Sequence, residues 1–126
     1  MPFIHIKSLP FETPPDVPAV ITGICKEFAE ANNIPVEHVH ATWEFFKPGH
    51  YAKGNRAPAS QPQSRHAVLV DLLTPDFNDP ATVQKMLRTL ANSLAVQANV
   101  SIRNIFINHR QAHSQMVFDD GDVVKW

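Results

Sequence analysis

Pro2, directly after Met1, is the residue of this sequence with the most specific chemical potential. Proline in that place normally permits removal of the methionine, so the mature chain would begin with a secondary amine. A free α-amine titrates near ~8, and desolvation or a nearby cation lowers that value, which would leave a neutral base at pH 7. Met-Pro also opens chains in which it has no role, so Pro2 alone does not define a site.

Other side chains offer weaker signals. Two histidines on one strand face can bind a metal, and His38 and His40 are such a pair; His109 and His113 are near each other in sequence. No third ligand stands at a suitable spacing, so the sequence favours neither metal nor cofactor. Cys25 lies in an apolar stripe, as expected of a buried, inert thiol. The cations that could bind a substrate carboxylate are Arg110, Arg65, Arg56 and Lys47.

The elements that must position these residues begin with a strand over 3–9, FIHIKSL, a short apolar run. Asp16 then caps a helix whose apolar residues recur at helical spacing. Asn32-Asn33 ends that helix. His38 to Phe46 alternates apolar and polar side chains, which indicates a second strand with two unlike faces.

The same order of elements returns in the second half. Ala67 to Leu73, AVLVDLL, reads as a buried strand. Asp79 caps a helix that begins with Pro80 and ends at Asn99. Residues 104–109, NIFINH, predict the fourth strand.

An internal repeat connects the two halves, because Asn32 to Glu44 aligns with Ala98 to Arg110 without a gap. Two strand-helix-strand units predict an α/β (α+β) fold: a four-stranded sheet, parallel pairing within each unit, and both helices on one face. The chain is expected to form one domain, 1–126. Its parts are unit one at 2–49, a loop at 50–64, unit two at 65–112, and a C-terminal hairpin at 113–126 about Asp120-Gly121.

Composition narrows the class of protein. The 126 residues are 44% hydrophobic and carry a formal net charge of -1, which suits a soluble globular domain and gives no reason to expect nucleic acid or a membrane as partner. A single cysteine, no signal peptide and no apolar stretch of about 20 residues make the cytoplasm the expected location. The sheet face without helices needs cover, which oligomerisation would supply.

The whole pattern resembles the tautomerase superfamily. The residues that carry the resemblance are Met1-Pro2, the IPVEHV segment from Ile34, the KPG turn from Lys47, and VSIRNIFIN from Val100. Two-unit members such as macrophage migration inhibitory factor and malonate semialdehyde decarboxylase match in length. The resemblance implies a homotrimer in which the amino-terminal proline is catalytic, in a pocket between neighbouring subunits.

The resemblance also assigns pocket residues. Asn108 and Phe106 match a stretch where macrophage migration inhibitory factor has an asparagine and a tyrosine, so the amide is kept and the phenol is lost. The arginines that decarboxylase and dehalogenase relatives hold after the third strand are absent from 73–76, Leu-Thr-Pro-Asp. We therefore expect Pro2 as the catalytic residue and Asn108, Phe106, Arg110 and Arg65 as substrate-binding residues.

The function that follows is keto–enol tautomerisation of a small carbonyl acid, without a cofactor. Two alternatives stay open. One is hydration, decarboxylation or dehalogenation with a protonated Pro2 as acid. The other is a non-catalytic trimeric binding protein of the same fold, which the lost phenol and missing arginines would suit.

Overall fold

A computed structural model describes residues 2–61 and 68–126 and confirms the two predicted strand-helix-strand units. Unit one consists of β1 (Phe3–Ser8), α1 (Val17–Ala31) and β2 (His40–Phe45). Unit two consists of β3 (Val68–Pro75), α2 (Pro80–Ala98) and β4 (Ile105–Ala112). A 3-10 turn precedes the second strand of each unit, η1 (Val36–His38) and η2 (Ile102–Asn104). The chain ends in the small hairpin of β5 (Phe118–Asp119) and β6 (Asp122–Val123).

Both helices begin and end at the residues that the sequence predicts. The Asp16 carboxylate accepts a hydrogen bond from the Ala19 amide at 3.2 Å, and Asp79 accepts one from Thr82 at 2.7 Å. Such caps satisfy amides that have no partner inside the helix. Asn99 ends α2 in the left-handed region, at φ 52°, which asparagine tolerates better than most residues.

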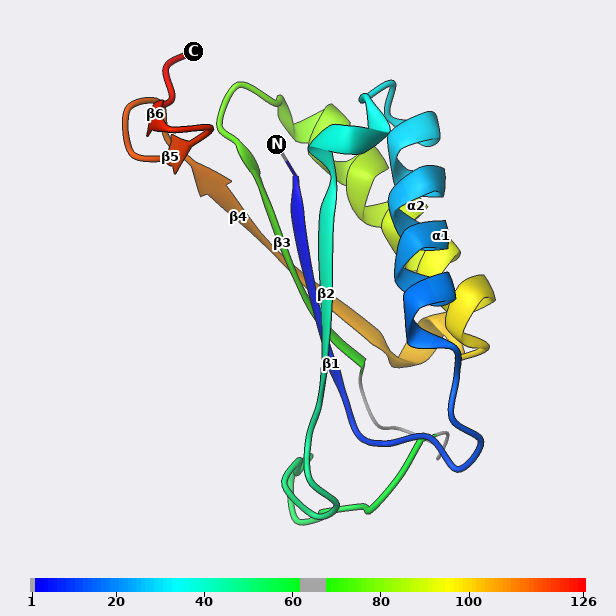
Figure 1. The fold of residues 1–126 in the computed structure, drawn as a ribbon. Coiled ribbons are helices and arrows are strands. Elements are labelled where there is room, and N and C mark those ends of the chain that lie inside the picture. The colour runs from blue at the N-terminus through cyan, green and yellow to red at the C-terminus, as the bar shows by residue number, and fades with distance from the viewer. Residues whose placement is uncertain (1, 62–67) are drawn as a thin grey trace.

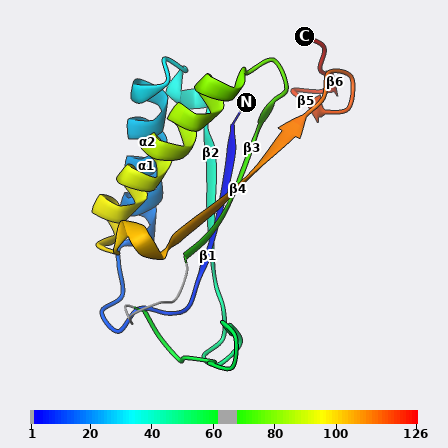
Figure 2. The same cartoon turned by 180° about the vertical axis from the view of Figure 1, so that it is seen from behind.

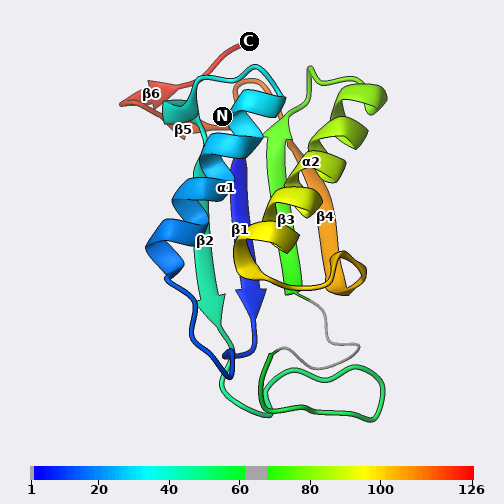
Figure 3. The ribbon, with the colours of Figure 1, turned by 90° about the vertical axis from the view of Figure 1, so that its right-hand side faces the viewer.

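The four main strands form one sheet in the order β2-β1-β3-β4 (Figure 3). β1 pairs with β2 and β3 pairs with β4 in parallel, whereas β1 and β3, which join the two units, are antiparallel. The two units therefore point in opposite directions. Each end of the sheet combines the start of one unit with the end of the other.

Both helices cover the same face of the sheet, as expected (Figures 1 and 2). The core lies between these two layers and includes Ile4, Ile6, Ile24, Phe28, Val68, Leu72, Leu90 and Leu94, each fully buried. Alternate strand residues point to the other face, which we call the open face. None of the helices among the described residues is long and apolar enough to cross a membrane.

The strands begin or end at residues that differ from the predicted ranges. β2 begins at His40 instead of His38, because the chain first makes the η1 turn, where the Val39 amide donates to the Val36 carbonyl at 3.1 Å. β3 and β4 run on to Pro75 and Ala112, which pair with each other. Ala67 lies outside the described residues.

The C-terminal hairpin is also confirmed. Asp120 and Gly121 both have positive φ, 50° and 84°, and they connect β5 to β6. A two-residue turn of this kind requires such backbone angles, which favour aspartate followed by glycine. The hairpin, the C-terminus and the N-terminus all lie at one end of the main sheet (Figures 1 and 3).

Candidate active site

The start of unit one meets the end of unit two at the end of the sheet where Pro2 lies, here called the Pro2 end. Phe3 pairs with His40 of β2 on one side and with Leu73 of β3 on the other. Leu73 in turn pairs with Arg110 of β4. The backbone thus sets four strands side by side at the level of Phe3. The Phe3 and His40 rings stack there with centroids 5.9 Å apart.

Pro2 is less than 2% exposed, and its carbonyl accepts a hydrogen bond from the His40 amide at 3.0 Å. Ile4 and Ile6 are buried under the helices, and the alternation of β1 puts Pro2 on that same face. Continuing the β1–β3 register brings Pro2 opposite Thr74, which is also fully buried. An amine at this place would stand at the margin of a low-dielectric layer.

Thr74 has a specific partner in the neighbouring strand. Its hydroxyl oxygen lies 2.7 Å from Nε2 of His109 in a hydrogen bond. Burial lowers the pKa of the His109 imidazole, because a low-dielectric environment disfavours the charged form. Near neutral pH, the His109 ring that hydrogen-bonds to Thr74 is therefore neutral.

The substrate-binding residues predicted on β4 lie on the open face. Phe106, Asn108 and Arg110 alternate along the strand, and Phe106 is 60% exposed. Nε of Arg110 lies 3.9 Å from a carboxylate oxygen of Asp71. Arg65, the fourth predicted binding residue, lies outside the described residues.

These residues lie at different distances from the Pro2 end, measured along the strand direction. Arg110 is level with Phe3, whereas Phe106 is four residues further from the Pro2 end, about 13 Å at the rise of a β-strand. Within one chain, Arg110 is therefore nearer to Pro2 than Phe106 is. Contact of Phe106 and Asn108 with the Pro2 of a neighbouring chain stays a prediction.

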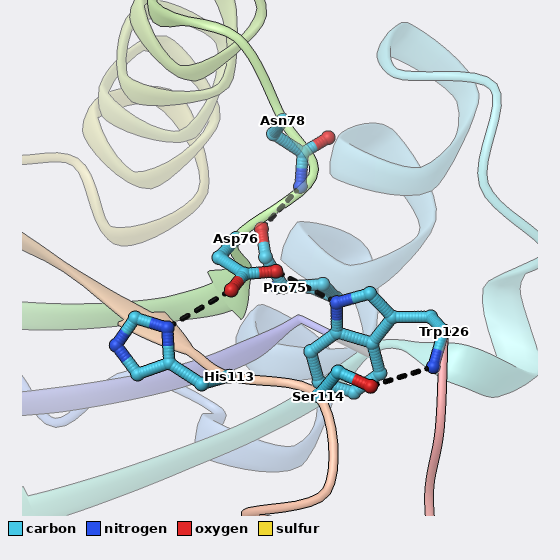
Figure 4. Close-up of polar contacts among 6 residues, drawn as sticks. All are labelled: Pro75, Asp76, Asn78, His113, Ser114 and Trp126. Atoms are coloured by element: carbon cyan, nitrogen blue, oxygen red, sulfur yellow. Dashed lines mark hydrogen bonds and ion pairs between the residues drawn. The ribbon is translucent and has the colours of Figure 1, made fainter.

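A polar cluster at the Pro2 end joins the β3–α2 turn to the C-terminal segment (Figure 4). The Asp76 carboxylate lies 2.9 Å from Nδ1 of His113 and accepts a hydrogen bond from the Trp126 indole N–H at 2.7 Å. The Trp126 amide donates to the Ser114 hydroxyl at 2.9 Å. Hydrogen bonds from Trp126 and then from His113 lower the pKa of Asp76, so this residue is a charged carboxylate near neutral pH.

Sequence reasoning did not find this cluster. The sequence indicates His113 only as a weak candidate metal ligand, and Asp76 only as part of a turn that lacks arginine. His113 is 37 residues from Asp76, and Trp126 is 50 residues from it. No local spacing reports such a contact, which depends on where the C-terminal segment returns to the sheet.

His40 lies beside Phe3 at the Pro2 end, but the remaining polar residues singled out in the sequence, where the structure describes them, do not form a cluster with it. His38 lies in η1 and His40 in β2, so the idea that they share one strand face is wrong. Lys47 and Arg56 follow the end of β2 that is remote from Pro2. Among residues 2–61 and 68–126, no group of three or more His, Cys, Asp and Glu side chains could hold a metal ion.

Two further features lie away from the Pro2 end. Cys25 is partly buried in α1, and burial raises the pKa of its thiol, as expected of an unreactive cysteine. A groove of about 410 Å³ lies beside α2 toward the start of β4. It is lined by Leu87, Arg88, Ala91, Asn92, Ile102, Ile105 and Ile107.

No family model and no curated protein sequence matches this chain. Solved structures do match it. A fused 4-OT, described as an asymmetric trimer, is 13% identical at a TM-score of 0.79, covering 96% of this chain and 94% of its own. A member of the cis-3-chloroacrylic acid dehalogenase family is 8% identical at 0.80, with coverage of 97% and 82%. FG41 malonate semialdehyde decarboxylase is 17% identical at 0.71, with coverage of 94% and 88%.

These three proteins belong to the tautomerase superfamily, and the chain has the fold of that superfamily over nearly its whole length. The fold that the sequence resemblance implied is therefore confirmed. At such low identity the likeness concerns the fold alone.

Proposed function

We propose that this protein is a keto–enol tautomerase whose base is the secondary amine of Pro2, formed by removal of Met1. The observation that carries the proposal is the burial of Pro2 at the start of β1, in a chain with the tautomerase-superfamily fold. Burial disfavours a charged ammonium, so we expect this amine to be neutral near pH 7 and able to accept a proton.

The substrate class is a small 2-oxo acid or its enol, such as an aryl or alkyl pyruvate. Pro2 would take a proton from the carbon beside the carbonyl group. Arg110, which is level with Phe3 in the sheet, would bind the substrate carboxylate. Asn108 of a neighbouring chain would donate to the substrate oxygen, and Phe106 beside it would form an apolar wall.

The same proposal includes a homotrimer. The open face holds exposed Phe106, and the C-terminal hairpin presents Met116 and Phe118, which are 81% and 72% exposed. Large apolar side chains exposed on a sheet face and on a hairpin can be covered by a neighbouring chain. We expect the hairpin to reach a neighbouring chain, and a monomer at micromolar concentration in sedimentation would contradict this assembly.

The experiment that tests the proposal compares three forms of the protein. They are the wild type with Met1 removed, Pro2→Ala, and a form with one extra residue before Pro2. Intact mass first establishes which N-terminus each form carries, and turnover of an enolised aryl pyruvate is then followed. The processed wild type should be faster than both variants by about 10²–10⁴-fold, the usual contribution of a positioned base.

Equal rates in all three forms would contradict the proposal. They would favour a trimeric binding protein that keeps the fold without catalysis. Two observations give that second function some support: residues 73–76 carry no cation, and Phe106 has no hydroxyl. If a 3-halo-acrylate or a 3-oxo acid reacts in a Pro2-dependent way and no enol does, Pro2 acts as an acid instead.

A further inference from the structure

The Asp76–His113 pair fixes one histidine at the Pro2 end in a defined orientation. Nδ1 of His113 faces the Asp76 carboxylate at 2.9 Å, and Asp76 is held from its other oxygen by the Trp126 indole N–H. Nε2 of His113 has no hydrogen-bond partner among the described residues, and the side chain is 65% exposed. A carboxylate that engages one ring nitrogen sets the ring orientation and stabilises the imidazolium, so the other nitrogen can exchange protons with a ligand.

The strand register sets the separation of His113 from Pro2. Thr74, opposite Pro2, pairs with Gln111, and His113 follows two residues later. Pro2 and His113 are separated by two inter-strand distances across the sheet and by two residues along the chain after Gln111. Together these put their Cα atoms about 12 Å apart. An imidazole side chain and a small 2-oxo acid together span that gap.

The proposed reaction needs a group that transfers a proton to the substrate oxygen, whereas the Asn108 amide can only hydrogen-bond to that oxygen and Phe106 has no hydroxyl. His109 is the other histidine of unit two near this end, but its Nε2 is already bonded to the Thr74 hydroxyl. His113 has a free ring nitrogen and a carboxylate partner. It therefore suits the task.

We infer that His113 is the acid partner of Pro2 in this site, with Asp76 as its positioning residue; the inference rests on the proposed function. Pro2 takes the proton from the carbon beside the carbonyl, and the resulting electron pair forms the C=C bond. The C=O π electrons move to oxygen, which takes the Nε2 proton of the His113 imidazolium. The enol leaves with Pro2 protonated and His113 neutral, and exchange with water restores both groups.

The simpler reading is that Asp76, His113 and Trp126 only hold the C-terminal segment against the β3–α2 turn. His113→Gln separates the two readings, because a glutamine amide can still donate to Asp76 but cannot transfer a proton. His113→Ala removes both functions and leaves space that free imidazole can enter. His50→Ala, in the loop that follows β2 at the opposite end of the sheet, is the matched control.

The test follows exchange of the C3 hydrogens of phenylpyruvate in D₂O by NMR, with Pro2→Ala as the reference for the base. We expect His113→Gln and His113→Ala to lower kcat about 10²-fold with little change in KM. Added imidazole should restore exchange in His113→Ala but not in Pro2→Ala, and His50→Ala should match the wild type. Asp76→Asn should lower kcat less than His113→Gln does.

The failures can be told apart. If exchange depends on Pro2 but proceeds at the wild-type rate in His113→Gln, His113 is only structural and the inference is overturned. Folded His113→Ala that imidazole does not rescue also overturns it. If the processed wild type shows no exchange, the proposed function itself falls, and the role of His113 falls with it.

Discussion

The two halves of this protein are copies in backbone and in several contacts, related by a shift of 66 residues. The shift brings η1 at 36–38 onto η2 at 102–104. It also brings Asn33, at φ 53°, onto Asn99, at φ 52°. Both asparagines follow a helix and turn the chain toward the next strand, so the repeat extends to the backbone angles of single residues.

Side-chain contacts repeat as well, with altered chemistry. The Trp43 indole N–H donates to the Ser8 hydroxyl at 3.1 Å, where unit two has His109 bonded to Thr74 at 2.7 Å. On the open face, His5 lies 2.8 Å from Glu44, whereas Asp71 lies 3.9 Å from Arg110. In unit one the acidic residue is on the second strand, β2, whereas in unit two it is on the first strand, β3.

The two ends of the sheet differ more than the two units do. At the end remote from Pro2, Phe11, Trp43 and Phe45 pack with ring centroids 6.0–6.3 Å apart. The residue equivalent to Pro2 by the repeat is Val68, which lies inside the chain and can never carry a free amine. The repeat therefore builds the sheet, and the two ends of the sheet differ in the side chains that they carry.

The largest expected effect distinguishes Pro2 from Val68, its equivalent by the repeat. Pro2→Ala should lower kcat/KM for an enol substrate by about 10²–10⁴-fold. Val68→Ala should lower the free energy of unfolding, because Val68 is fully buried, and should leave kcat unchanged. Steady-state kinetics with urea unfolding of both variants checks this, and a matching loss of activity in folded Val68→Ala would contradict it.

The next effect tests whether the helices of the two units contribute equally to the stability of one core. Ile24 and Leu90 are equivalent by the repeat, and both are fully buried. Ile24→Ala and Leu90→Ala should each reduce the free energy of unfolding by about 2–5 kcal/mol, the cost of lost burial and an unfilled cavity. Urea midpoints and slopes measure both. A loss below about 1 kcal/mol at one site only would mean that the helices do not share one core.

A smaller effect should appear at Arg110. Hydrogen bonds to a charged group contribute about 1.5–3 kcal/mol, so Arg110→Gln should raise KM for a 2-oxo acid roughly 10- to 150-fold. Glu44→Gln, which introduces glutamine at the equivalent strand position, is the control and should leave KM unaltered. If Arg110→Gln has no effect on KM, some other cation binds the carboxylate.

The smallest effect concerns pH. Because burial lowers the pKa of His109 below 6.5, the unfolded chain binds a proton more readily than the folded one, and stability falls as pH drops below about 6.5. His109→Gln should flatten this loss between pH 7 and pH 5, as followed by urea unfolding.

Much of the fold could be predicted from the sequence because it depends on local signals. Asp16 and Asp79 cap the helices, and Asp120-Gly121 forms the hairpin turn, all as their residue types indicate. The start of β2 could not be predicted, since His38 continues the alternating pattern while its backbone is already part of a 3-10 turn.

The site was less accessible to sequence reasoning. Pro2 has a local signal, the methionine before it, but its burial depends on two strands and the helix layer. The contact of Asp76 with His113 and Trp126 joins segments that meet only because β3 and β4 end together and the C-terminal segment turns back. Such contacts follow from tertiary structure, which no spacing of residue types reports.

The central claim is that Pro2 carries a free amine that is neutral near pH 7, and ¹⁵N NMR of protein labelled with [¹⁵N]proline tests it most directly. Of the 11 prolines, only an unblocked Pro2 can give an amine resonance that titrates. We predict one such resonance, with a midpoint below the ~8 of a free α-amine, that disappears when a residue is added before Pro2. Absence of any titrating amine in the natively processed protein, or a midpoint at or above that value, would contradict the account.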